Sequence, residues 1–285
     1  MPAVSIAPPP RPPRRRLLAA AAGLAAAATL PGCAGLRAPP TRVPMAVTRL
    51  AAPCRADTLV VLLPGALSAP REFVDEGWIR ALHDERRLAA DAWLVDAHPG
   101  YYLERSILQR LREDVLVPAR AAGYARVWLA GISLGGFGAL GCAARHPGEV
   151  DGVLAVAPYL GRRSLLKEIG DAGGPRRWRA DVPPPRPGQD DDLEREVWRM
   201  LAGGDTARLF LGHGREDRFA GAQRVAAALL GDRGFSVPGG HDWPAWRPLW
   251  AQWLDRGLLA PRCAADPAST RELPRGRPGG LAPGR

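Results

Sequence analysis

The middle of the chain alternates short apolar runs with longer segments of helical spacing. The apolar runs lie at 59–63, 92–97, 127–132, 153–157, 207–211 and, more briefly, 235–237. Continuous runs of this length are typical of strands buried on both faces, as in a parallel sheet. Segments with helical spacing lie between and after them, at 73–85, 105–122, 134–145, 219–230 and 245–258. The alternation predicts a doubly wound, mostly parallel α/β sheet with right-handed crossovers.

One interval, 161–204, interrupts this alternation. It contains a Gly-Gly-Pro step, the sequence VPPP at 182–185 and the acidic run Asp190, Asp191 and Asp192. Only 193–201 has the pattern of a helix, and the acidic run is expected to be solvated. The interval is therefore interpreted as a small cap-like insertion above the sheet, after the half of the domain that carries the candidate nucleophile.

The N-terminal residues 1–33 have the pattern of an export signal. A cationic segment at 11–16 precedes a short Ala/Leu-rich apolar segment at 17–30. The sequence RRRLL at 14–18 resembles a twin-arginine signal, and LPGC at 30–33 resembles a bacterial lipobox in which Cys33 is lipidated. The expectation is a periplasmic or membrane-anchored lipoprotein of a bacterium, with simple cleavage of the signal as the alternative.

The rest of the chain divides into a lead-in linker at 34–56, the main α/β domain at 57–260 and a tail at 261–285. The tail is rich in Pro, Gly, Ala and Arg and is expected to be disordered. Of the formal net charge of +10, residues 1–33 carry +4 and the tail +3, which leaves +3 for everything between. A domain so near neutrality argues against nucleic-acid binding as the main task.

The cysteines do not have the spacing of a zinc site. Cys142 falls on the expected buried face of the helix at 134–145 and is interpreted as a core residue. Cys54 and Cys263 flank the predicted domain, and whether they pair in an oxidising compartment stays open. No metal and no cofactor are expected.

The sequence GISLG at 131–135 matches the nucleophile elbow of serine hydrolases. A buried strand is predicted before it and an Ala/Leu/Gly-rich helix after it. In that position Ser133 would project above the sheet edge, with the helix N-terminus favouring developing negative charge. The alternative is a structural Gly-Ser turn.

Ser133 needs a base, and in this fold class the chain order is serine, acid, histidine. His83 and His98 precede the serine, while His146 ends the following helix and His213 ends a predicted strand too early to follow the acid. His241, in the loop before the last predicted helix, is the candidate base.

Asp217 is the candidate acid, because it lies just past the strand at 207–211. A carboxylate there can accept the Nδ1 hydrogen of His241 and hold the tautomer that deprotonates Ser133. Two alternatives remain open at this point: Glu216 as the acid, and a helix-capping role for Asp217.

The oxyanion of an acyl-transfer reaction needs two hydrogen-bond donors. The backbone amide of Leu134, the residue after the nucleophile, is one candidate. The other is expected from the loop after the first predicted strand, with Ala66 as first choice and Leu67 as second. The side chains there are apolar, so the donors are main-chain amides.

The GISLGG sequence at 131–136 together with Asp217 and His241 resembles the α/β-hydrolase superfamily across about residues 58–258. The segment from Gly240 to Trp246 looks like the histidine loop of the putative-esterase branch, which includes feruloyl esterases and mycolyltransferases. The resemblance implies a sheet of the eight-stranded type and ester hydrolysis through an acyl-enzyme.

The sequence as a whole predicts an exported serine hydrolase that acts on a small-molecule carboxylic ester. A thioesterase or acyltransferase would use the same three residues, since fold does not determine substrate. The alternative from another class is a non-catalytic surface lipoprotein that uses the hydrolase scaffold for binding. The apolar helix around Val197 and Trp198 is a candidate lining for an acyl pocket.

Overall fold

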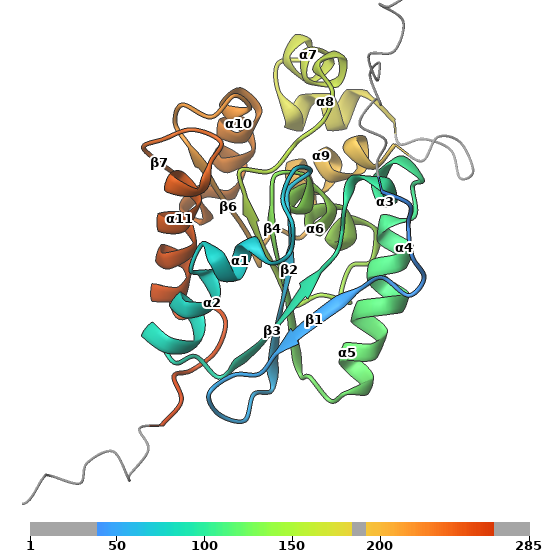
Figure 1. The fold of residues 1–285 in the computed structure, drawn as a ribbon. Coiled ribbons are helices and arrows are strands. Elements are labelled where there is room, and N and C mark those ends of the chain that lie inside the picture. Colours follow the sequence, from blue (N-terminus) through green and yellow to red (C-terminus); the bar gives the residue numbers. More distant parts are fainter. Residues whose placement is uncertain (1–38, 184–191, 265–285) are drawn as a thin grey trace, which may run out of the picture. The chain divides into compact units, whose positions relative to one another are not determined.

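The computed structural model describes residues 39–183 and 192–264. Within them, seven strands form one sheet in the order β1-β3-β2-β4-β5-β6-β7 (Figure 1). The strands are β1 (Val47–Leu50), β2 (Thr58–Leu63), β3 (Ala90–Val95), β4 (Arg126–Ile132), β5 (Gly152–Val156), β6 (Leu209–Gly214) and β7 (Gly234–Val237). All neighbouring pairs are parallel except β1 with β3. The doubly wound, mostly parallel α/β sheet predicted from the apolar runs is confirmed.

The described part of the chain has a seven-stranded sheet instead of one of the eight-stranded type. The strand β1 lies in the segment that was predicted as a linker. Its four residues, VTRL, are only partly buried and include the charged Arg49. It pairs with β3 alone, at the edge of the sheet, and an edge strand this short carries little hydrophobic signal.

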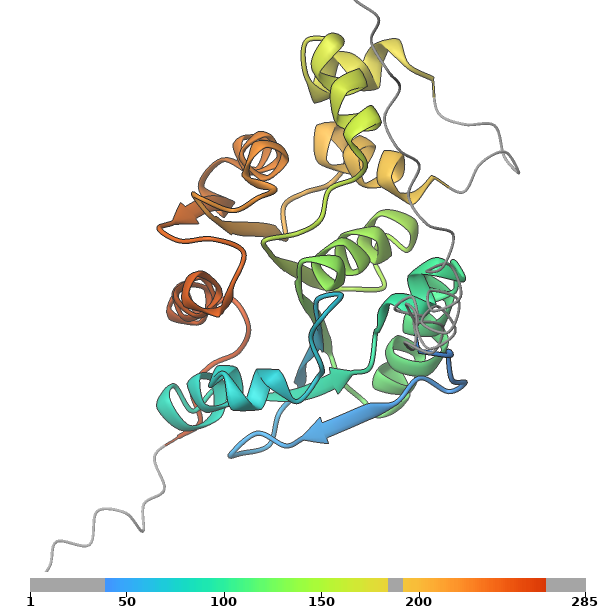
Figure 2. The same ribbon diagram turned by 45° about the horizontal axis from the view of Figure 1, so that its top comes forward.

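Helices cover both faces of the sheet (Figures 1 and 2). One face is covered by α1 (Glu72–Asp75), α2 (Trp78–Arg80), the π-helical turn η1 (Ala81–Glu85) and α11 (Trp243–Asp255). The other is covered by α4 (Ile107–Leu111), η2 (Arg112–Leu116), α5 (Val117–Ala121), α6 (Leu134–Arg145) and α10 (Ala220–Leu230). A further short helix, α3 (Pro99–Leu103), follows β3.

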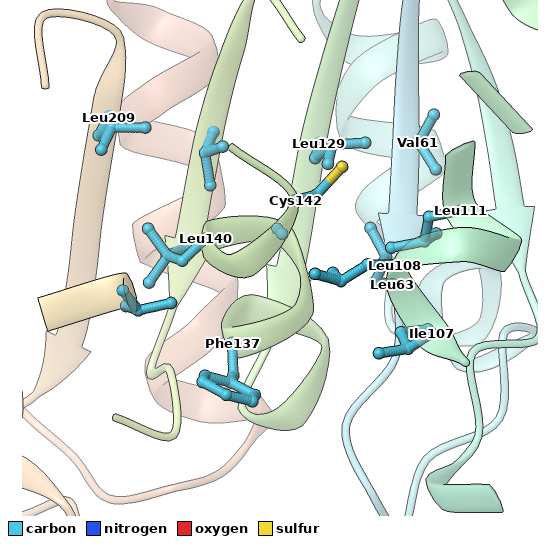
Figure 3. Packing of buried hydrophobic residues seen from close by; sticks show 14 of the residues in the cluster. Val61, Leu63, Ile107, Leu108, Leu111, Leu129, Phe137, Leu140, Cys142 and Leu209 are labelled. Carbon is cyan, nitrogen blue, oxygen red and sulfur yellow. The ribbon is translucent and has the colours of Figure 1, made fainter. Parts of the chain in front are cut away.

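Alternate residues of each central strand point to opposite faces, which produces two apolar layers. Val61 and Leu63 of β2 pack with Leu111 of α4 and Cys142 of α6 on one side (Figure 3). Val60 and Leu62 belong to the other layer, on the face covered by α1, α2 and α11. Because every residue of β2 is buried, its sequence is a continuous apolar run without alternation.

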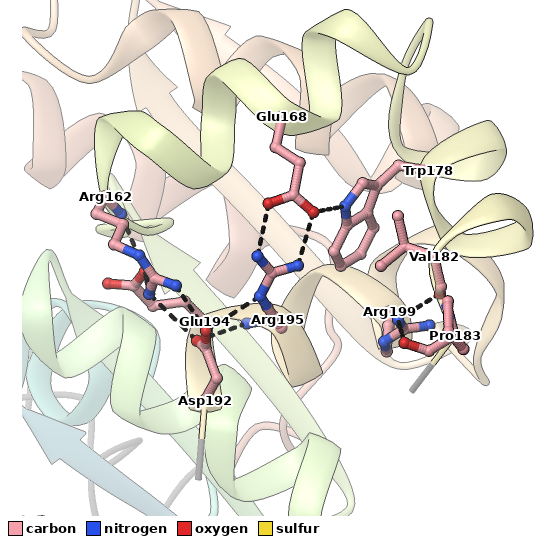
Figure 4. Close-up of polar contacts among 9 residues, drawn as sticks. All are labelled: Arg162, Glu168, Trp178, Val182, Pro183, Asp192, Glu194, Arg195 and Arg199. Carbon is pink, nitrogen blue, oxygen red and sulfur yellow. Dashed lines mark hydrogen bonds and ion pairs between the residues drawn. The ribbon is translucent and has the colours of Figure 1, made fainter. Parts of the chain in front are cut away.

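The insertion at 161–204 contains three helices among its described residues: α7 (Arg163–Asp171), α8 (Pro175–Asp181) and α9 (Leu193–Gly203). The prediction of a single helix was therefore wrong. The two missed helices are short, and tertiary contacts stabilise them. Glu168 of α7 accepts hydrogen bonds from Trp178 of α8 at 2.8 Å and from Arg195 of α9 at 2.7 and 2.5 Å (Figure 4). These bonds, first from Arg195 and then from Trp178, lower the pKa of Glu168 to about 2, so it stays ionised.

The acidic run was expected to be solvated, and for Asp192 this was wrong. Its carboxylate caps α9 by accepting from the Arg195 amide at 3.3 Å, and it pairs with Arg162 at 2.7 Å (Figure 4). Glu194 pairs with the same guanidinium at 2.7 Å. These contacts fasten the start of α9 to the end of the loop after β5. Asp190 and Asp191 lie outside the described residues.

Cys54 and Cys263 form a disulfide, which answers the question left open by their spacing. The bond joins the segment before β2 to the start of the tail. Residues 261–264 are held against the domain, since the amide of Ala89 donates to Pro261 and that of Cys263 to Arg87. The remaining tail and the candidate signal, including Cys33, lie outside the described residues. No helix within 39–183 or 192–264 has the length and apolar character to cross a bilayer.

Candidate active site

Ser133 lies in the turn between β4 and α6 with φ of +53°, a region that L-residues rarely occupy. Its amide donates to the carbonyl of Val156 in the next strand at 2.9 Å. Gly135 allows this turn, because a Cβ there would collide with the carbonyl oxygen of Leu63. The side chain is held in a strained, nearly buried position above the ends of β4 and β5, as in a nucleophile elbow.

His241 reaches the serine from the loop between β7 and α11. Its Nε2 lies 2.9 Å from the Ser133 Oγ, and its Nδ1 lies 2.7 Å from the Asp217 Oδ2. The rings of Phe219 and Trp246 meet the imidazole edge-on, with centroids 5.2 and 5.3 Å away. The structure thus brings together the three residues that the chain-order argument selected, in one unbroken series of hydrogen bonds.

Asp217 is buried, and its carboxylate is fully shielded from solvent. Burial alone would raise the pKa of this carboxyl. Hydrogen bonds from His241, from the Phe219 amide and from Gln223 outweigh burial and hold the pKa below its ordinary value. The carboxylate is therefore ionised and can accept a hydrogen bond from the Nδ1–H group of the imidazole.

The hydrogen bonds of Asp217 and Glu216 bear on the two alternatives, a capping role for Asp217 and Glu216 as the acid. Oδ1 of Asp217 accepts from the Phe219 amide at 2.7 Å just before α10, so Asp217 caps this turn as well as holding His241. The Glu216 carboxylate instead accepts from the Gly239 amide at 2.6 Å. Glu216 fastens the loop that carries His241 without touching the ring.

Gln223 belongs to the site and was not found in the sequence. It lies on α10, is fully buried, and its Nε2 donates to the Pro158 carbonyl at 3.2 Å and to the Asp217 Oδ2 at 3.3 Å. A glutamine in a helix of ordinary amphipathic pattern gives no signal of such a role. Only the packing of α10 beside the loop after β5 creates it.

Replacing Gln223 by leucine is expected to lower kcat about tenfold with little change in KM. The variant loses the donor that steadies the Asp217 carboxylate and leaves the Pro158 carbonyl without a partner, at a cost of about 1–3 kcal/mol in unfolding free energy. Steady-state kinetics and urea unfolding measure the two effects. Gln252→Leu, at an exposed position of α11, is the matched control and should change neither.

The loop after β2 lies directly beside the serine. A Cβ placed on Gly65 would stand 3.6 Å from the Ser133 Cβ, so the backbone at 65 borders the nucleophile. Ala66 and Leu67 follow it, and the Leu67 side chain is 91% exposed. Across the site, Leu134 is the first residue of α6, where amides have no acceptor within the helix. The residues chosen as oxyanion donors therefore come from the two segments that flank Ser133.

Glu72 joins this loop to the histidine loop, a link not anticipated from the sequence. One carboxylate oxygen accepts from the Ala69 amide at 2.7 Å and the other from the Trp243 indole at 3.2 Å. The segments that flank Ser133 and His241 are thereby connected through one side chain.

A cavity of about 470 Å³ opens beside the serine, between the end of α3, the start of α6 and the start of α9. Its lining consists of Tyr102, Leu103, Arg105, Ile107, Leu108, Leu134, Phe137, Arg145, Tyr159, Arg162, Asp192, Leu193 and Glu194. Val197 and Trp198 do not line it, contrary to expectation. Both are buried in the core, where the Trp198 indole donates to the Leu160 carbonyl at 2.7 Å. No group of three or more His, Cys, Asp or Glu side chains suited to a metal ion occurs in the part of the chain described here.

The sheet topology and the serine at its elbow define the class of α/β hydrolases. A family model described as "Putative esterase" matches residues 82–255, and the chain belongs to this family. The protein is accordingly a hydrolase.

Solved structures with the same fold are known. They include an S-formylglutathione hydrolase from Agrobacterium tumefaciens (TM-score 0.54, 14% identity, covering 78% of this chain and 93% of that one). A ferulic acid esterase is similar (TM-score 0.52, 15% identity, 76% and 94%), as is Est1E from Butyrivibrio proteoclasticus (TM-score 0.50, 13% identity, 75% and 93%). No curated protein matches the sequence. At these identities the likeness concerns the fold.

Proposed function

We propose that the protein is a carboxylic ester hydrolase whose nucleophile is Ser133, with His241 as general base and Asp217 as the acid that orients it. The observation that supports this most strongly is the series of hydrogen bonds from Ser133 Oγ through His241 to Asp217, at 2.9 and 2.7 Å. Such distances allow a proton to pass from the serine to the imidazole as the hydroxyl attacks.

In this proposal Ser133 attacks the acyl carbonyl while His241 Nε2 takes its proton. The amides of Leu134 and Ala66 stabilise the negative charge that develops on the carbonyl oxygen. His241 then gives the proton to the leaving alcohol, which produces an acyl-enzyme on Ser133. Water, activated by the same imidazole, hydrolyses this ester and restores the free serine.

The test is reaction with a fluorophosphonate probe together with turnover of short p-nitrophenyl esters. The wild-type protein is expected to be labelled on Ser133 and to release p-nitrophenol catalytically. A panel that varies acyl length and leaving group, with thioesters and acceptor alcohols included, distinguishes an ester hydrolase from a thioesterase or an acyltransferase.

We also propose that the protein is exported and anchored through a lipid on Cys33. The support comes from the cationic and apolar segments before LPGC at 30–33 and from the disulfide between Cys54 and Cys263, since such bonds persist in oxidising compartments.

Mass spectrometry of the mature protein is expected to find Cys33 as a lipid-modified first residue. Cys33→Ala should move the protein from the membrane fraction to the soluble fraction, because the acyl chains are lost. Cys142→Ala is the matched cysteine control and should leave the distribution unchanged, as Cys142 is buried in the core. An unmodified terminus downstream of residue 33 would contradict the anchor.

A further inference from the structure

Arg105 is a cation at the wall of the cavity. It follows α3, lines the cavity beside Ser133 and is exposed to solvent. Within 39–183 and 192–264, its guanidinium makes neither a hydrogen bond nor an ion pair. A guanidinium favours an anionic ligand. A carboxylate fits it well, because its two oxygens can accept two parallel N–H hydrogen bonds from the planar group.

The other charged side chains that line the cavity form ion pairs. Arg162 pairs with both Asp192 and Glu194, whose carboxylates would otherwise repel an anion. Arg145 pairs with Glu196. The excess positive charge that the cavity presents to a ligand is therefore that of Arg105.

The backbone at Arg105 gives no reason for an arginine. Its φ is +57°, and it occupies the left-handed position that follows a helix C-terminus. The Arg105 amide donates to the Tyr102 carbonyl at 3.1 Å and the Ser106 amide to the Tyr101 carbonyl at 2.9 Å, a Schellman arrangement. Glycine is favoured at this position, so the side chain of Arg105 is retained at a conformational cost.

The uncharged part of the wall consists of aliphatic and aromatic side chains, some of them close to Ser133 in the sequence or in space. Phe137, Ile107 and Leu108 form part of it, and Leu134 directly follows the nucleophile. Tyr159 also lines the cavity, and its amide donates to the Ser133 carbonyl at 3.0 Å. The cavity thus adjoins Leu134 and Tyr159, which both neighbour Ser133, and Arg105 lies at its wall.

We propose that this cavity selects esters that carry a carboxylate, which Arg105 binds while the intervening apolar part of the substrate packs on Phe137 and Leu134. This specificity rests on the proposed ester hydrolase function. The carboxylate that Arg105 binds is a second group of the substrate, on its acyl or its alcohol side, and is distinct from the ester carbonyl that Ser133 attacks.

The experiment compares two matched pairs of esters. In the first, the mono-4-nitrophenyl ester of adipic acid is compared with the analogue whose far carboxylate is a primary amide. In the second, 4-acetoxybenzoate is compared with 4-acetoxybenzamide. In at least one pair, wild-type kcat/KM for the carboxylate is expected to exceed that for the amide about tenfold, the worth of one charge-assisted hydrogen bond. The preference should shrink as ionic strength rises.

Arg105→Gly is expected to reduce the carboxylate-to-amide ratio of kcat/KM to about one, and glycine suits the left-handed backbone there. Arg87→Gly is the matched control: Arg87 also has a positive φ, of +49°, and is exposed, but it does not line the cavity. It should keep the wild-type preference.

Absence of a preference in both pairs, or a preference that survives Arg105→Gly, overturns the inference while the ester hydrolase proposal stands. If Ser133 is unlabelled and no ester is turned over, that proposal fails, and calorimetric binding of benzoate then tests the cavity directly. Affinity about tenfold weaker in Arg105→Gly than in Arg87→Gly supports the inference, and equal affinity overturns it.

Discussion

Ser133→Ala is expected to abolish fluorophosphonate labelling and to reduce turnover of short p-nitrophenyl esters by at least about 10⁴-fold. The reason is that Ser133 Oγ is the hydroxyl within 2.9 Å of the His241 Nε2, so its removal takes away the atom that would form the acyl-enzyme. Alanine faces the same backbone strain as serine at φ of +53°, so the turn is expected to keep its shape.

The matched control is Ser164→Ala, at an exposed position of α7 remote from the hydrogen-bonded series. It should be labelled and should turn over esters like the wild-type protein. Peptide mapping of the labelled wild type must place the adduct on Ser133. Labelling that persists in Ser133→Ala would contradict the assignment of the nucleophile, and labelling without turnover in the wild type would favour a binding protein.

The strands could be predicted because burial on both faces leaves continuous apolar runs. The predicted run at 127–132 corresponds to Arg126–Ile132, with a difference of one residue. At β6 the apolar run ends at 211, whereas the strand continues to Gly214 through the buried His213. A histidine between two glycines does not extend an apolar run, so the sequence pattern does not mark these residues as strand. In the structure the His213 Nδ1 lies 2.8 Å from the Gly214 carbonyl oxygen.

The elements that were missed depend on contacts distant in sequence. The helices α3, α7 and α8 have five to nine residues, too few to be stable alone. Trp178 of α8 shows the cause: its indole is buried against Glu168 and lies near the guanidinium of Arg199, 4.9 Å from the ring centroid. Hydrophobic periodicity over seven residues cannot reveal such a bond.

The residues of the candidate site also fall into those that the sequence could select and those that it could not. Chain order and strand ends select Ser133, Asp217 and His241, because in a parallel sheet the carboxyl ends of neighbouring strands meet at one edge. The supporting residues Glu72 and Gln223 and the cavity at Arg105 arise where separate segments pack together. These contacts exist only after folding, so the sequence pattern contains no trace of them.

Asp217→Asn is expected to lower kcat by roughly 10³- to 10⁴-fold, while Glu216→Gln should cost less than about tenfold. In the aspartate variant, the side-chain oxygen that accepts from the Phe219 amide at 2.7 Å would keep that bond. The new NH₂ group would then face His241 and require its Nδ1 to be an acceptor. The imidazole would hold its proton on Nε2, directed at Ser133, and could not act as a base.

Glu216→Gln is the matched control, because it makes the same change of carboxylate to amide one residue earlier. Its amide oxygen can still accept from the Gly239 amide, which Glu216 binds at 2.6 Å, so the histidine loop stays in place. Steady-state kinetics of both variants on one p-nitrophenyl ester decide between them. A larger loss in Glu216→Gln than in Asp217→Asn would transfer the orienting role to Glu216. That result would require the loop before α11 to rearrange during catalysis, since the Asp217 carboxylate is the one in contact with His241.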